Sequence, residues 1–271
     1  FFQAEDGIRY SSTSRGLGDV YKRQHYRCLD DLEWASFFVP AGDLDERAVE
    51  WLSGFDAIIS YLHDPDGVWE DNVKRVWRGE WISGPGLPPD NENRSISKIL
   101  LEPLKAWGIA GANSEPCLTL PNQADSLYAL GAHPGSGSRA KNWPETCWEQ
   151  FLQHSLVMER GGILLIAGEA EQDRLGWMES VVGDQGKIHF GKTLLETAHT
   201  LRQCRLFVGH DSGMTHLAAA LGVRCVVLWG ETNRDVWRPP QDHVTVLEGG
   251  KGLKEISVDV VLAAVAAAGT R

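Results

Sequence analysis

A His, an Asp and a Ser stand directly before a glycine and a run of small residues in GHDSGMTHLAAALG (residues 209–222), with apolar runs on both sides. A strand, a polar turn, a short helix and a second strand present a helix N-terminus to a ligand at the edge of an α/β sheet. His216 lies in the first turn of this helix, where its ring can reach the same ligand or be structural. The simpler interpretation of the turn is a cap, in which Asp211 or Ser212 accepts a hydrogen bond from the helix that begins near Met214.

A second polar loop, HPGSGSRAKN (residues 133–142), follows the strand predicted at 127–132. Ser136 and Gly137 offer donors to an anion, and Lys141 brings a positive charge to the start of the next helix, which is unfavourable unless an anion compensates it. Because the carboxyl ends of parallel strands share one edge, both polar loops can face one crevice. Two helix N-termini there suit a nucleoside diphosphate. A flexible surface loop with a solvated lysine is the alternative.

The stretch GKIHFGKT (residues 186–193) matches the phosphate-loop pattern GxxxxGK[ST]. Its middle positions include Ile188 and Phe190, which indicate a strand rather than a backbone that curls around phosphates. We interpret the match as a coincidence. A nucleoside triphosphatase is the alternative, and it predicts Mg²⁺-dependent binding that Lys192→Ala abolishes. The sequence has no HExxH or CxxC pattern, so it offers no support for a metal site. It also lacks the GxSxG pattern of a nucleophilic serine and the GxGxxG pattern of dinucleotide-binding folds.

Strand and helix patterns alternate regularly in the second half of the chain. The predicted strands are near-continuous apolar runs, which is typical of a doubly wound parallel sheet covered on both faces. We expect strands at 127–132, 162–168, 187–190, 205–208, 225–229 and 243–249, with helices between them and a last helix at 257–269. The first half is less regular: a strand at 55–62, helices at 69–77 and 95–109, and a linker at 113–125.

Composition limits the partners and the compartment. The net charge of −11, without a basic cluster, excludes nucleic acid as a partner. The longest apolar stretch, residues 260–269, is about half a membrane span. Five scattered cysteines predict buried free thiols in a reducing compartment. Among the eleven tryptophans, the clusters at Trp69, Trp77 and Trp81 and at Trp143 and Trp148 are expected in the core, and platforms for flat ligands such as sugars are the alternative.

Residues 1–24 have no usable periodicity and resemble the translated read-through of sequencing-library adapters. We therefore exclude them from the fold prediction. The remaining chain is expected to hold a partial N-terminal Rossmann-like domain at 25–122 and a complete C-terminal domain at 123–271.

Three separated motifs carry a family resemblance: HPGSGSRAKNWP, GEAEQD, and the run from GKTLLETAHT to DVWRPP that contains GHDSG. They resemble the C-terminal half of glycosyltransferase family 9, the lipopolysaccharide heptosyltransferase family. The resemblance runs from about residue 127 to the end. It implies the GT-B fold, in which two Rossmann-like domains face a cleft and the C-terminal one holds most of the nucleotide sugar.

The resemblance assigns donor-binding roles to both polar loops. Ser136, with Gly137 beside it, and Lys141 would contact the donor's phosphates. Ser212 and Gly213 would hold the diphosphate at the helix N-terminus.

Three further positions complete the implied donor site. Asp211 would reach the sugar, His216 would support that pocket, and Glu171 would lie near the nucleoside. The family needs neither a metal nor another cofactor, because these donors and Lys141 neutralise the leaving diphosphate.

In this family a Gly-Asp loop after the first strand supplies the catalytic base, which by position should precede residue 25. Asp19 in GLGD is the candidate there, but no apolar strand precedes it, so the base stays unassigned. We expect a fragment of an inverting transferase that moves heptose from an ADP-linked donor to a lipopolysaccharide-type or other glycan acceptor, which can be lipid-linked. The resemblance further implies a cytoplasmic monomer with peripheral contact at the inner membrane face. A non-catalytic nucleotide-sugar-binding module on the same fold is the alternative.

Overall fold

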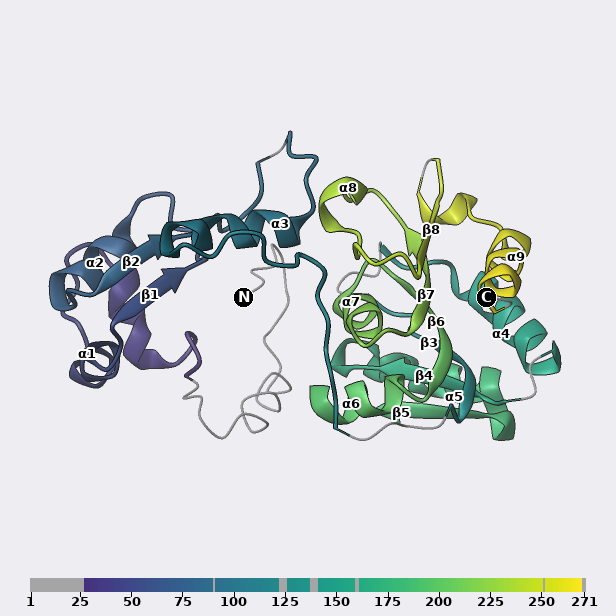
Figure 1. The fold of residues 1–271 in the computed structure, drawn as a ribbon. Coiled ribbons are helices and arrows are strands. Elements are labelled where there is room, and N and C mark those ends of the chain that lie inside the picture. The colour runs from purple at the N-terminus through teal and green to yellow at the C-terminus, as the bar shows by residue number, and fades with distance from the viewer. Residues whose placement is uncertain are drawn as a thin grey trace. The chain divides into compact units, whose positions relative to one another are not determined.

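The computed structural model describes residues 27–89, 91–121, 126–136, 141–158, 161–250 and 252–269 (Figure 1). They form two compact units that divide between Ser114 and Glu115, inside the predicted linker. Hydrogen bonds hold the strand-free segment 115–121 against the rest of the C-terminal unit, among them one from Nη1 of Arg202 to the carbonyl of Leu120 at 3.0 Å. The N–H of Leu118 donates to the carbonyl of Ala220 at 2.8 Å, and Gln241 donates to the carbonyl of Pro116 at 2.7 Å. Residues 1–24, with Asp19, lie outside the described residues.

The C-terminal unit contains a six-stranded parallel sheet in the order β5-β4-β3-β6-β7-β8. This is the 3-2-1-4-5-6 order of dinucleotide-binding Rossmann folds, in which the connections change direction between the two central strands. The predicted α/β class with a parallel sheet is confirmed. The strands are β3 (Tyr128–Ala132), β4 (Ile163–Ala167), β5 (Gly186–Phe190), β6 (Cys204–His210), β7 (Arg224–Trp229) and β8 (Val244–Glu248).

Helices cover both faces of this sheet (Figure 1). Successive residues of β6 show why, since Leu206 and Val208 enter one core cluster while Phe207 enters the other. Both faces are therefore apolar, which explains the continuous apolar runs in the sequence. One face packs against α4 (Glu145–Met158), α5 (Leu175–Val182) and α9 (Val258–Gly269), and the other against α6 (Leu194–Leu201) and α7 (Gly213–Ala220).

The N-terminal unit is built around a β–α–β element. β1 (Ala57–Ser60) and β2 (Glu80–Ser83) pair in parallel and are joined by α2 (Val68–Val76). A core of aromatic and aliphatic side chains lies between α2, α1 (Glu46–Ser53) and the 3-10 helix η2 (Leu32–Phe38). Tryptophan supplies much of this core: Trp69 and Trp77 are buried in it, as predicted, and so is Trp34.

Two expectations for this unit need correction. β2 has no counterpart in the sequence prediction, because four residues that are mostly not buried carry no clear apolar pattern. The helix predicted at 95–109 is α3 (Ile96–Leu101) followed by the 3-10 helix η3 (Glu102–Trp107). Pro103 near the start of η3 lacks the N–H that a continuous α-helix needs.

Candidate functional site

Two polar loops leave the carboxyl ends of the neighbouring strands β3 and β6. One begins at His133, whose N–H donates to the carbonyl of Val208 at 3.0 Å, and the other begins at Asp211. Since the chain connections change direction between these two strands, their loops diverge and leave a crevice. The structure thus places both predicted polar loops at the position where α/β sheets bind ligands.

The N-terminus of α7 is not capped by a side chain. Ser212 occupies the N-cap position in an extended conformation, and its side chain makes no capping hydrogen bond. Within the described residues, the N–H groups of Gly213 and Met214 have no acceptor. Ser212 Oγ is buried, also without a hydrogen-bond partner in that part of the chain. The alternative interpretation, a cap by Asp211 or Ser212, is therefore wrong, and the donors that a cap would satisfy have no partner in the described residues.

A cavity of about 390 Å³ brings Lys141 and Asp211 together. Two residues that the sequence prediction missed, Glu231 and Thr232, also line it. The cavity offers one cation, two carboxylates and a hydroxyl, which fits a ligand that carries negative charge and hydroxyl groups. Leu228, Gly230, Gly252 and Leu253 complete its lining.

Ser136 belongs to the loop after β3, but its hydroxyl is already engaged. The side chain is buried, and Oγ donates to Oδ1 of Asn142 at 2.7 Å. This bond joins the two described ends of the loop. Gly137, predicted beside it, lies outside the described residues.

Glu171 is a buried carboxylate behind the same loop, with only 4% of its surface exposed. Its Oε2 accepts the N–H of Gly168 at 2.9 Å and lies 3.5 Å from Nε2 of His133. Burial favours the neutral acid, but His133, the Gly168 N–H and the more distant Arg174 outweigh it, so the pKa of Glu171 lies below its ordinary value. The contact of Glu171 with a nucleoside stays a prediction.

His210, at the end of β6, links three segments of the site. Its Nε2 accepts the N–H of Trp143 at 2.8 Å, which leaves the proton on Nδ1 to be donated to the carbonyl of Gly135 at 3.0 Å. Burial lowers the pKa of His210 to about 4. The role of this histidine in GHDSG was not predicted, and its position at the end of an apolar strand was the available signal.

His216 lies in α7 beside Asp211. Burial lowers the pKa of His216, and this effect is opposed by the charge of Asp211 and by a hydrogen bond to the backbone of Trp237. Trp237 ends α8 (Arg234–Trp237), so His216 connects α7 with the segment after β7. Its predicted supporting role in the sugar pocket stays a prediction.

The phosphate-loop match lies in a different structural context. Its first five residues are β5 itself (Gly186–Phe190), so they form a strand and not a loop. Thr193, the position that would bind Mg²⁺ in such a loop, caps α6 instead: its Oγ1 accepts the N–H of Glu196 at 3.2 Å and donates to the Glu196 carboxylate at 2.8 Å.

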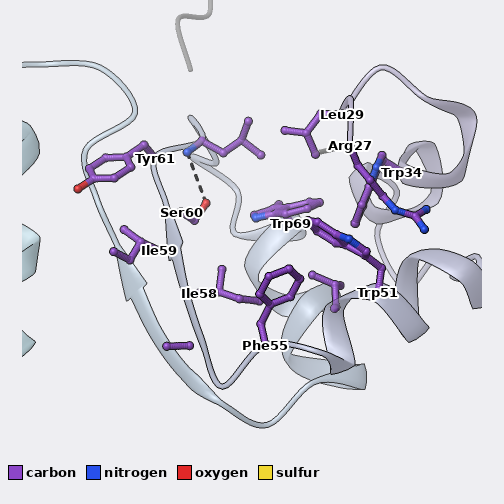
Figure 2. A pocket seen from close by; sticks show the side chains of 13 residues that line it. Arg27, Leu29, Trp34, Trp51, Phe55, Ile58, Ile59, Ser60, Tyr61 and Trp69 are labelled. Atoms are coloured by element: carbon purple, nitrogen blue, oxygen red, sulfur yellow. Dashed lines mark hydrogen bonds between the residues drawn. The ribbon is translucent and has the colours of Figure 1, made fainter. Parts of the chain in front are cut away.

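A second cavity, of about 290 Å³, lies beside β1 in the N-terminal unit (Figure 2). Trp34, Trp51 and Trp69 line it, and the rings of Trp34 and Trp51 meet edge to face at 78°. The indole N–H groups of Trp34 and Trp69 are buried without an acceptor among the described residues. None of the predicted donor-binding residues lines this cavity.

Within the described ranges, no three His, Cys, Asp or Glu side chains gather closely enough to hold a metal ion. The helices of the described chain also include none with the length and apolar character needed to cross a bilayer.

Comparison with known proteins identifies the family. Residues 115–258 match the model of glycosyltransferase family 9 (heptosyltransferase), which is more than half of the chain. The chain belongs to glycosyltransferase family 9. A curated relative of this family 9 chain is lipooligosaccharide heptosyltransferase 2 of Campylobacter jejuni subsp. jejuni serotype O:2, 30% identical over 121 residues. That match covers 42% of the family 9 chain and 37% of the relative, so the chain spans little more than a third of that protein.

Solved structures resemble the family 9 chain over more of its length. A glycosyl transferase family 9 structure from Veillonella parvula DSM 2008 is 18% identical with a TM-score of 0.66, covering 83% of this chain and 76% of that one. The E. coli heptosyltransferase WaaC with ADP-2-deoxy-2-fluoro heptose is 18% identical with a TM-score of 0.62, covering 82% and 76%. These likenesses confirm the predicted fold type, that of GT-B heptosyltransferases.

Proposed function

We propose that the C-terminal unit binds the diphosphate of a nucleoside-diphosphate sugar at the N-terminus of α7. One observation carries the proposal: the first turn of α7 leaves the N–H groups of Gly213 and Met214 and the buried hydroxyl of Ser212 without partners in the described residues. The partial positive charge of a helix N-terminus adds to these donors. Lys141 and Asp211, at the nearby cavity, supply a cation for phosphate and a carboxylate for sugar hydroxyls.

The proposed donor is ADP-heptose and the proposed acceptor a growing lipopolysaccharide-type glycan. The family model and the ADP-linked sugar bound to WaaC support the donor. The curated relative, a lipooligosaccharide heptosyltransferase, supports the acceptor. A cytoplasmic location and peripheral contact with a membrane stay predictions.

The proposed reaction is an inverting transfer. A base removes the proton of an acceptor hydroxyl, whose oxygen attacks the anomeric carbon as the bond to the nucleoside diphosphate breaks. The leaving diphosphate gains negative charge, which the α7 N–H groups and Lys141 stabilise without a metal. We assign no base, because Asp19 lies outside the described residues.

Calorimetric titration of the intact chain with ADP, UDP, GDP and ATP, each with Mg²⁺ or with EDTA, tests the proposal. We expect metal-independent binding of ADP that Lys141→Ala weakens tenfold or more, because a hydrogen bond to a charged group is worth about 1.5–3 kcal/mol. Lys192→Ala, at an exposed lysine of the phosphate-loop match, is the matched control and should leave binding unchanged.

Two results would overturn the proposal. Absence of diphosphate binding by a folded chain would remove the donor site. Mg²⁺-dependent binding of ATP that is lost in Lys192→Ala and kept in Lys141→Ala would favour the nucleoside triphosphatase. Transfer of heptose from ADP-heptose to an acceptor, detected by mass spectrometry, would separate the enzyme from a non-catalytic binding module.

A further inference from the structure

Thr232 contacts the carboxylate that the proposed donor site assigns to the sugar. Its Oγ1 donates a hydrogen bond to Oδ2 of Asp211 at 2.6 Å. The two residues follow the neighbouring strands β7 and β6, and both line the 390 Å³ cavity. In the described part of the chain, Oδ1 of Asp211 accepts no hydrogen bond, so one carboxylate oxygen is fixed and the other is open to a ligand.

The backbone of Thr232 is itself anchored to the sheet. Trp229, the last residue of β7, is fully buried, and its indole Nε1–H donates to the carbonyl of Thr232 at 2.8 Å. A threonine hydroxyl has a single proton, and here that proton goes to Asp211. The orientation of the carboxylate is thereby set by a residue whose main chain is tied to the core.

We propose that Thr232 is a positioning residue that orients Asp211, so that the cavity binds a nucleoside diphosphate carrying a sugar more tightly than the free nucleoside diphosphate. This inference rests on the proposed function of the same site. A carboxylate already held in one orientation loses less conformational entropy when it accepts a hydrogen bond from a sugar hydroxyl. This smaller entropy loss raises the affinity for the sugar part of the ligand alone. Replacement of Thr232 should leave the diphosphate contacts unchanged, because α7 and Lys141 provide those contacts.

The test compares the affinities of the intact chain and its variants for ADP and for ADP-heptose by calorimetry. Thr232→Val removes the hydroxyl and keeps the side-chain shape. It should weaken ADP-heptose binding about two- to tenfold, the value of one net hydrogen bond, and leave ADP binding within twofold. Thr232→Ser keeps the hydroxyl and should bind both ligands as the unchanged chain does.

Two further variants separate positioning from general structural support. Thr200→Val removes a hydroxyl that donates to the backbone carbonyl of Glu196 on α6, and it should change neither affinity. In an Asp211→Asn background, Thr232→Val should have no further effect on ADP-heptose binding, because the carboxylate that it positions is gone.

The outcomes distinguish this inference from the proposed function. If Thr232→Val weakens ADP and ADP-heptose equally, or weakens neither, Thr232 does not position the sugar contact and the inference fails while the diphosphate site stands. Equal affinity of the unchanged chain for ADP and ADP-heptose would also contradict the inference and leave the diphosphate site standing. If the unchanged chain binds neither ligand, the proposed function itself fails.

Discussion

The imidazole of His210 accepts the backbone N–H of Trp143 at 2.8 Å, a contact between residues that are 67 positions apart in the sequence. Through its other nitrogen the same ring holds the carbonyl of Gly135. His210 therefore fixes the start and the end of the polar loop after β3 to the end of β6. It does so only as a neutral ring, because Nε2 must be free of a proton to accept a hydrogen bond.

Acidification should destabilise the C-terminal unit through His210. The folded-state pKa of about 4 lies below the ordinary value of 6.5, so the unfolded chain binds the proton first as the pH falls. The stabilisation is complete above pH 6.5 and is lost as the pH falls to about 4, at a cost of about 3 kcal/mol. Urea unfolding of the chain and of His210→Gln at several pH values checks this. An equal acid loss in both proteins would assign the effect to other groups.

Gly135→Ala should destabilise the chain by about 1–3 kcal/mol through overpacking. A Cβ at this position would lie 2.1 Å from Oε1 of Glu171, a side chain that is buried and accepts a hydrogen bond from the N–H of Gly168. Gly176→Ala is the control, since a Cβ on this α5 glycine meets no atom within 4 Å and should be neutral or stabilising by up to about 1 kcal/mol. Chemical denaturation measures both. The cost at Gly135 should shrink in a Glu171→Ala background, and an unchanged cost there would contradict the steric explanation.

Thr193→Ala should cost about 1 kcal/mol of stability and leave nucleotide binding intact, because this threonine caps α6. Thr193→Ser keeps the hydroxyl and should recover most of the loss. Urea unfolding and ADP titration of the three proteins measure the two effects separately. Loss of nucleotide binding in Thr193→Ala at unchanged stability would mean that the hydroxyl serves a ligand.

The buried thiols should resist alkylation in the folded protein. Burial raises the pKa of both Cys204 and Cys225 to about 12, so at pH 8 only about one thiol in ten thousand is a reactive thiolate. Cys117 is exposed and should react with iodoacetamide. Peptide mass spectrometry after labelling, with and without denaturant, checks this. Labelling of Cys204 without denaturant as fast as that of Cys117 would contradict the burial argument.

The sequence predicted the sheet of the C-terminal unit well, because strands that are buried on both faces consist of consecutive apolar residues. The run CVVLW, for example, corresponds to β7, in which Cys225 and Val227 pack on one face and Val226 and Leu228 on the other. β2 escaped prediction for the opposite reason: its positions are mostly not buried, so packing left little apolar pattern in its residues.

The site was predictable where its residues are consecutive. GHDSG covers the last two residues of β6 and the turn after it, HPGS follows β3 directly, and the structure brings Lys141 and Asp211 to one cavity. Pairings across the sequence were not predictable. Thr232 reaches Asp211 over 21 positions, and this contact depends on the sheet setting β6 beside β7.

If the proposed donor binds at the crevice, the strand order also gives it a part in folding. β3, β4 and β5 form one half of the sheet, β6, β7 and β8 form the other, and the chain passes between the halves through α6. Each half contributes one polar loop to the crevice, so a diphosphate held by both loops would bridge the two halves. Its binding would then stabilise the association of the two halves by RT ln(1 + [L]/Kd), and the stability of the central β3–β6 pairing would depend on the concentration of the ligand.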